Sequence, residues 1–340
     1  LVGALRSGPA LLVCTSRPVS AGAHDALVAC MDELARSRVL EISLTELDPS
    51  ETAELIGRRA GAPVPEAVAR YVHERSGGNP LFVRELTDLL ASEGRLGEAD
   101  LDEGRRPVPS GVSAVVRRRV SRLDGPDAQR LLTIASVLGS PFPSAVLADV
   151  AGLDQAATVD QLGAILDAGL LVPGEEPGTY RFSHALVEDA LAAELNAARR
   201  ASLHAAAAHS LARRHPGDDR AGLVARHAVA GIEAGTAELA IDAGTRAASL
   251  ATARSSHAEA ARHWDQVATA LAHARPDAVR DRVRIRANQA RALLRADRVM
   301  EMRPVAASAL EVALGLGDAE LAGETAGLLN PVSIYTPLVY

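Results

Sequence analysis

Apolar residues recur along most of this chain at helical spacing, and a few short continuous apolar runs interrupt that pattern. Residues 10–15 are of strand length and apolar enough to be buried on both faces, and residues 39–42 form a second, short strand-like run. A helix is predicted between them over residues 25–37, and no further strand is predicted until about residue 170. The first segment therefore reads as the last part of an α/β domain.

A small helical bundle is predicted over residues 49–93, where helical stretches alternate with breaks. Asp48 or Ser50 is placed to cap the first helix, because a short polar side chain before a helix accepts hydrogen bonds from its free N–H groups. Residues 61–65 and 76–80 contain the Gly and Pro residues that end one helix and begin the next.

Three short helices follow, over residues 128–138, up to residue 150 and up to about residue 168. Two strand-like segments come next, residues 170–172 and 179–183, separated by a Pro-Gly-Glu-Glu-Pro-Gly turn. Three helices followed by a two-stranded hairpin is the order of elements in a winged helix.

From residue 184 almost to residue 329 the pattern is helical and rich in Ala, with Gly- or Pro-containing breaks. Stacked helical hairpins fit this pattern best. The segment resembles a tetratricopeptide-like array, although most of the large aromatic residues of that repeat are missing.

Composition then excludes several kinds of chemistry. The 36 basic residues are all Arg, so a complete GxxxxGK[ST] phosphate loop and any lysine Schiff base are impossible. The ten histidines show no metal-binding spacing; His204 and His209, for example, point away from each other on a helix. The net charge of −7 argues against nucleic acid as the main partner. Cys14 and Cys30 fit no disulfide, zinc or redox pattern, and no apolar run reaches the length of a membrane span, which predicts a cytoplasmic protein.

Two segments, residues 76–86 (SGGNPLFVREL) and 180–187 (YRFSHALV), carry a family resemblance. They resemble the GNP-containing lid and the winged-helix histidine of STAND-type signalling ATPases, a branch of the AAA+ group, and in particular the large actinobacterial regulators of the LuxR type. Residues 14–18 resemble the sensor strand of that family, and residues 44–47 its entry to the lid. The likeness covers about residues 1–230, and the order of the four elements matches.

The resemblance implies a mainly α, multidomain chain. Its parts would be a remnant of a P-loop α/β domain, a helical lid, a winged-helix domain with its leading helix, and a helical-repeat region, at residues 1–45, 46–106, 107–200 and 201–340.

The resemblance also implies a nucleotide site. In the family the proline of the lid turn lies against adenine, which points to Pro80, with Gly78 and Asn79 shaping the turn. Arg17, at the end of a strand, would reach a terminal phosphate, and the His184 imidazole would bind the β-phosphate of ADP. The ordinary interpretations stay open: a plain helix-start turn, a surface arginine, and a histidine that caps the helix it begins.

The function implied is that of an ATP/ADP-switched signal-transduction ATPase, acting as a transcriptional regulator. ADP would hold the lid and winged helix closed, the repeats would sense an inducer or protein partner, and the ATP-bound form would self-associate. The phosphate loop, the Mg ligands and the DNA-binding domain are expected outside this chain, so the chain alone is expected neither to hydrolyse ATP nor to bind DNA. The alternative is a non-catalytic scaffold in which the helical repeats bind other proteins.

Overall fold

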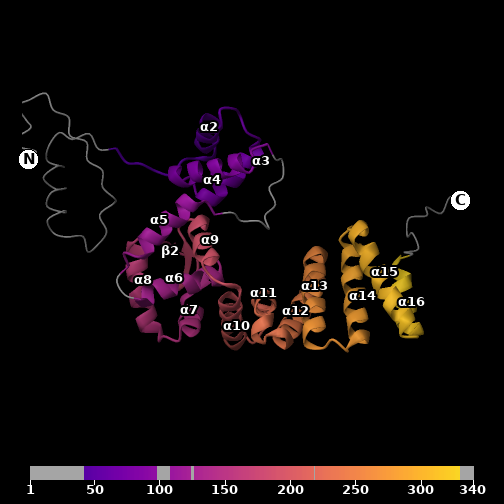
Figure 1. Cartoon of the computed structure of the whole chain (residues 1–340). Coiled ribbons are helices and arrows are strands. Elements are labelled where there is room, and N and C mark those ends of the chain that lie inside the picture. The colour runs from indigo at the N-terminus through magenta and orange to yellow at the C-terminus, as the bar shows by residue number, and fades with distance from the viewer. Residues whose placement is uncertain (1–41, 98–107, 124–125, 218, 330–340) are drawn as a thin grey trace, which may run out of the picture. The chain divides into compact units, whose positions relative to one another are not determined.

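The computed structural model describes residues 42–97, 108–123, 126–217 and 219–329 (Figure 1). From Leu47 onward these residues belong to one unit, and they are mainly helical with one small three-stranded sheet. The predicted mainly α fold is confirmed for this part of the chain. The strand predicted over residues 10–15, the helix over residues 25–37 and all but the last residue of the run at 39–42 lie outside the described residues.

The first three helices are α2 (Pro49–Ala60), α3 (Glu66–Ser76) and α4 (Pro80–Ser92). Of the two candidate caps, Asp48 is the one used: its Oδ1 accepts from the Glu51 N–H at 2.8 Å, and Glu51 Oε2 accepts from the Asp48 N–H at 2.9 Å. This reciprocal capping box fixes the start of α2. The helices enclose their own core, formed by Ile56, Val68, Ala69, Val72, Val83, Leu86 and Leu90.

The next elements are α5 (Ser110–Val120), α6 (Pro126–Leu138), β1 (Phe142–Pro143), α7 (Ser144–Ala151), α8 (Gln155–Asp167), β2 (Leu171–Pro173), β3 (Thr179–Phe182) and α9 (Ala185–Ala193). The predicted three helices and hairpin are all present. The expectation of no strand between residues 42 and 170 is wrong, because β1 pairs antiparallel with β3 and the sheet order is β1-β3-β2. Two residues, one of them a proline, are too short to show alternation in the sequence.

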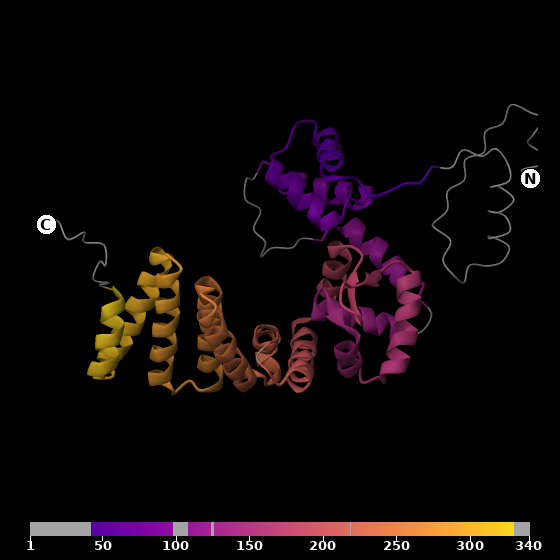
Figure 2. The ribbon, with the colours of Figure 1, turned by 180° about the vertical axis from the view of Figure 1, so that it is seen from behind.

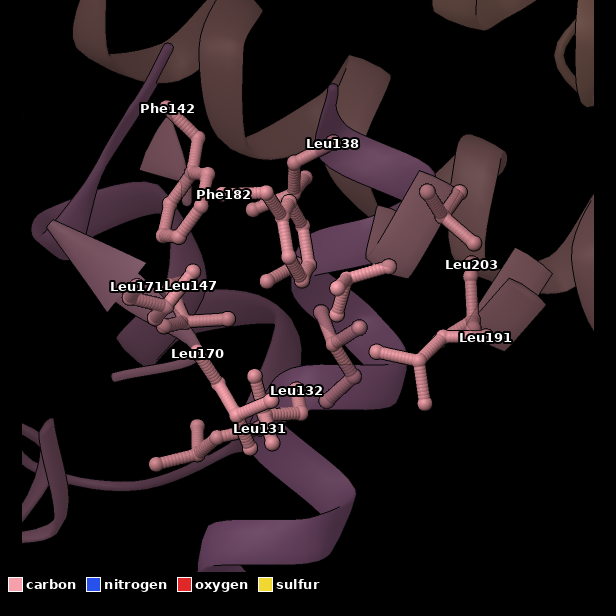
Figure 3. Close-up of a cluster of buried hydrophobic side chains, with 14 of the residues drawn as sticks. Leu131, Leu132, Leu138, Phe142, Leu147, Leu170, Leu171, Phe182, Leu191 and Leu203 are labelled. Carbon is pink, nitrogen blue, oxygen red and sulfur yellow. The ribbon is translucent and has the colours of Figure 1, made fainter. Parts of the chain in front are cut away.

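A single apolar core joins these elements (Figure 3). In the sheet, Phe142 and Phe182 lie with their ring centroids 6.3 Å apart, and Leu171 is the register partner of Phe182. The core reaches back to Phe82 in α4 and forward to Leu203 in the helix after α9. Because Phe82 is 1% exposed within it, α4 is held against the helices and strands that follow.

The rest of the described chain consists of consecutive helices joined by short turns: α10 (Ala197–Arg214), α11 (Ala221–Ala230), the 3-10 helix η1 (Ile232–Ala234), α12 (Ala237–Ala253), α13 (His257–Ala274), α14 (Val279–Arg295), α15 (Val299–Gly315) and α16 (Ala319–Leu329). Each of these helices packs mainly on the ones before and after it (Figures 1 and 2). The predicted helical-repeat region is therefore confirmed.

Small residues allow these helices to approach closely. The fully buried alanines of the region are Ala207, Ala208, Ala225, Ala228, Ala240, Ala243, Ala248, Ala260, Ala270, Ala287, Ala290, Ala306 and Ala313. At Gly244, in the middle of α12, a Cβ would lie 2.7 Å from Val267 Cγ2 on α13, and Val267 is itself fully buried. Gly323, in the middle of α16, is exposed, and a Cβ there would meet nothing within 4 Å.

Gly323→Ala is expected to raise the free energy of unfolding by about 0.5–1 kcal/mol, because alanine favours a helix over glycine. Gly244→Ala has the same gain in helix propensity, but it forces α12 and α13 apart. We therefore expect the free energy of unfolding to fall by about 1–3 kcal/mol. Urea unfolding of both variants measures the difference, and equal effects would contradict the close packing of α12 on α13.

Candidate functional site

The turn between α3 and α4, residues 76–80, has a backbone that requires glycine. Gly77 and Gly78 both lie in the left-handed region, with φ of +58° and +71°. The Gly78 N–H donates to Ser76 Oγ at 3.2 Å, and the Gly78 carbonyl accepts from the Leu47 N–H at 2.9 Å. The turn is thus fixed from both sides, by its own serine and by the segment that enters α2.

Asn79 caps the helix that follows the turn. Its Oδ1 accepts from the N–H groups of Leu81 at 3.1 Å and Phe82 at 3.4 Å. Asn79 therefore occupies these two amides at the start of α4, and they are not available to a ligand. Pro80 is the first residue of α4 and is exposed, so a ligand can contact its ring.

His184 lies directly against this turn. It follows β3 and stands at the N-cap position of α9, but its side chain makes no capping hydrogen bond. Its ring meets the Phe82 ring edge-on, with centroids 5.3 Å apart and an interplanar angle of 86°. On the other side, a Cβ at Gly77 would lie 2.8 Å from His184 Nδ1. Only glycine at position 77 lets the imidazole approach so closely.

Of the five residues singled out from the sequence, Gly78, Asn79 and Pro80 lie in or next to the turn, and His184 packs against the neighbouring Gly77 and Phe82. The fifth, Arg17, lies outside the described residues. Gly77 and Phe82, which make the contact with His184, were present in the quoted motif but were given no role there. A large apolar residue two positions after the proline was the available signal for Phe82.

A second polar cluster, which sequence reasoning missed, joins α10 and α11. His204 Nδ1 and His227 Nδ1 lie 2.9 Å apart, and Arg226 Nη2 lies 3.3 Å from His227 Nε2. Burial, together with the nearby Arg226 charge, lowers the pKa of His227 to about 3 and that of His204 to about 4. Both imidazoles are therefore neutral at pH 7, and one Nδ1 donates to the other. Because His204 was compared only with His209 on the same helix, the sequence did not identify His227, on the next helix, as the partner of His204.

A third cluster ties α7 to α10. Asp149 accepts from Arg214 Nε and Nη2, both at 2.8 Å, and from Ser210 Oγ at 2.6 Å. The hydrogen bond from Arg214 is the main reason that the pKa of Asp149 falls to about 2, with a further contribution from Ser210. Three hydrogen bonds to one carboxylate therefore connect α7 to α10.

No group of three or more His, Cys, Asp or Glu side chains is placed to hold a metal ion in the ranges that the structure describes. Over the same ranges, every helix is too short or too polar to cross a bilayer.

A family model described as "Domain of unknown function (DUF8739)" matches residues 48–96, the segment of α2–α4. No curated protein matches the chain. Among solved structures, the chain is similar to a Signal Transduction ATPase with Numerous Domains (STAND) protein with a tetratricopeptide repeat sensor from Pyrococcus horikoshii, at 12% identity and a TM-score of 0.23. That alignment covers 86% of this chain and 58% of the other, and its TM-score is too low to equate individual elements.

Proposed function

We propose that this chain is the nucleotide-responsive part of a STAND-type signal-transduction ATPase, in which α2–α4 and the following three-helix and hairpin segment close over an adenine nucleotide. The observation that carries the proposal is the contact of His184 with the glycine turn. Two segments far apart in the sequence, each resembling a nucleotide-contacting motif, meet within van der Waals distance. In this proposal the three-helix and hairpin segment is a winged helix.

The residues at this contact can bind both the base and the phosphates of an adenine nucleotide. The exposed Pro80 ring offers a flat apolar surface for a base, and the His184 imidazole is a donor for a phosphate oxygen. A nucleotide supplies a polyphosphate whose charge and length differ between its di- and triphosphate forms. Arg17 remains a proposed phosphate contact, and Mg would be held by residues outside this chain.

The switch would act through the difference between the two nucleotide states. If His184 contacts the nucleotide only in the ADP-bound closed form, the free energy of that contact stabilises the closed form and not the open one. The contact then shifts the equilibrium between the two forms by that amount. The helical repeats α10–α16 would bind an inducer or protein partner, and the open ATP-bound form would self-associate. We further propose that the whole protein is a LuxR-type transcriptional regulator that acts in the cytoplasm.

The test is the rate of ADP release from the protein that carries this chain. His184→Ala is expected to speed dissociation of a fluorescent ADP analogue by roughly ten- to hundredfold, the value of one charge-assisted hydrogen bond. ATP release should stay the same, because the contact is absent from the open form. His273→Ala, at an exposed position of α13, is the control. An unchanged rate of ADP release in His184→Ala would remove this residue from the site.

The same measurement addresses the alternative, a scaffold in which only the helical repeats work. The regular packing of α10–α16 favours that alternative. A scaffold predicts no saturable ADP binding to the whole protein, and it predicts that His184→Ala alters thermal stability alone.

A further inference from the structure

A buried ion pair lies beside the His184 contact. Arg75 is in the last turn of α3, directly before the glycine turn, and Asp189 is in α9, the helix that His184 begins. Arg75 Nη2 donates to Asp189 Oδ2 at 2.7 Å, and the side chains are only 10% and 11% exposed. The pair therefore joins the same two segments that meet at His184.

The surroundings of Arg75 are poorly suited to a lone charge. Its guanidinium carbon lies 5.5 Å from the centre of the Tyr71 ring, which gives a favourable cation–π contact. Its Nε–H group, however, is buried and finds no acceptor within the described parts of the chain. Asp189 is thus the counter-charge that makes the burial of Arg75 tolerable.

Buried ion pairs of this kind have a known energetic character. The attraction between the charges is largely offset by the loss of their hydration, so the intact pair adds little net stability. Removal of one partner is far more disruptive, because the other charge is then buried alone. Such a pair fixes the relative position of two elements, yet it separates readily when both charges regain water.

We propose that Arg75 and Asp189 are positioning residues that hold His184 against the Gly77 turn, and that their separation is the step that opens this site. The first part concerns the fold alone, whereas the second rests on the proposed function. The pair carries this role because it links α3 directly to α9, and because each partner lies within a few residues of the turn or of His184.

The test reads the position of His184 without any nucleotide. In the wild-type chain the Phe82 ring, edge-on at 5.3 Å, shifts the carbon-bound protons of the His184 imidazole in an NMR spectrum of histidine-labelled protein. In Asp189→Ala the unpaired Arg75 drives α3 and α9 apart to reach water, so the His184 signals are expected to move toward their unfolded-chain values. Phe82→Leu removes the aromatic ring, so the change of the His184 signals in this variant shows how much of their shift comes from Phe82.

Two further variants distinguish positioning from general damage. Asp88→Ala breaks the Arg59–Asp88 pair, which is bidentate but about half exposed and internal to α2–α4; it should leave the His184 signals in place. The double variant Arg75→Met/Asp189→Leu removes both buried charges and fills their volume, so it should keep nearly wild-type signals. Circular dichroism reports in parallel whether each variant is folded, and Asp189→Asn replaces Asp189→Ala if the latter does not fold.

The outcomes are separable. Unchanged His184 signals in both Asp189 variants would overturn the positioning role. Signals that move as far in the double variant as in Asp189→Ala would show that the unpaired charge is not the cause, and would overturn it as well. If the role is correct, ADP release from the whole protein should be roughly tenfold or more faster in Asp189→Ala. If ADP release is faster in His184→Ala but unchanged in Asp189→Ala, the opening step is wrong, while the positioning role and the nucleotide proposal stand. If release is unchanged in both variants, the nucleotide proposal loses its support, while the positioning role stands.

Discussion

Acidification from pH 7.5 to pH 5 is expected to lower the free energy of unfolding by about 2 kcal/mol through His227 alone. The folded state holds the pKa of this buried imidazole at about 3, chiefly because burial disfavours its charged form. In the unfolded chain its pKa is the ordinary value of about 6.5. The unfolded state therefore binds more protons between these two values, and stability is lost as the pH falls below about 6.5.

His204 adds to the same effect, because its pKa is lowered to about 4 by burial and by Arg226 and Arg200. The window between pH 7.5 and pH 5 isolates these imidazoles from the carboxylates that hold helices together. Asp149, whose folded pKa is about 2, loses its stabilising contribution only as the pH falls below its ordinary value near 4.

Urea unfolding at the two pH values measures the difference directly. His227→Gln lowers stability at both values, but it should reduce the pH-dependent part by about 2 kcal/mol. His209→Gln, at an exposed position on the same helix as His204, should leave the pH dependence as in the wild type. A wild-type chain with equal stability at both pH values would show that the two imidazoles are not buried as a neutral pair.

Local features of this fold could be predicted from the sequence because their causes lie within a few residues. Asp48 and Glu51 fix the start of α2 three residues apart, and the Gly-Gly-Asn-Pro segment both ends α3 and caps α4. The hairpin of β2 and β3 followed from two apolar runs and a turn between them. The helical-repeat region followed from its spacing of alanines.

Contacts between distant segments could not be predicted in the same way. Arg75 pairs with Asp189 114 positions away, and in the sequence it is one of 36 basic residues with nothing to mark it. His204 meets His227 across a helix boundary, 23 positions apart. Only the resemblance of two motifs pointed to a meeting of the glycine turn with His184, and the packing that joins them, through Gly77 and Phe82, needed the fold.

That packing makes Gly77 a sensitive position, and Gly61 is its matched control. Both are left-handed residues that end a helix, with φ of +58° at Gly77 and +75° at Gly61. Alanine at either position meets the same backbone penalty of about 1–2 kcal/mol, because a Cβ disfavours the left-handed conformation. A Cβ at Gly61 would meet nothing within 4 Å, whereas one at Gly77 would lie 2.8 Å from His184 Nδ1.

Gly77→Ala is therefore expected to lower the free energy of unfolding by about 1 kcal/mol or more beyond the decrease in Gly61→Ala, because the His184 imidazole must leave its place against Phe82. The His184 proton signals should move in Gly77→Ala and stay at their wild-type positions in Gly61→Ala. If His184 holds ADP in the closed form, release of a fluorescent ADP analogue from the whole protein should also be several-fold faster in Gly77→Ala only. Equal losses of stability in the two variants, with unmoved His184 signals, would contradict the close approach of the imidazole to the turn, and the proposed nucleotide site would lose the contact on which it rests.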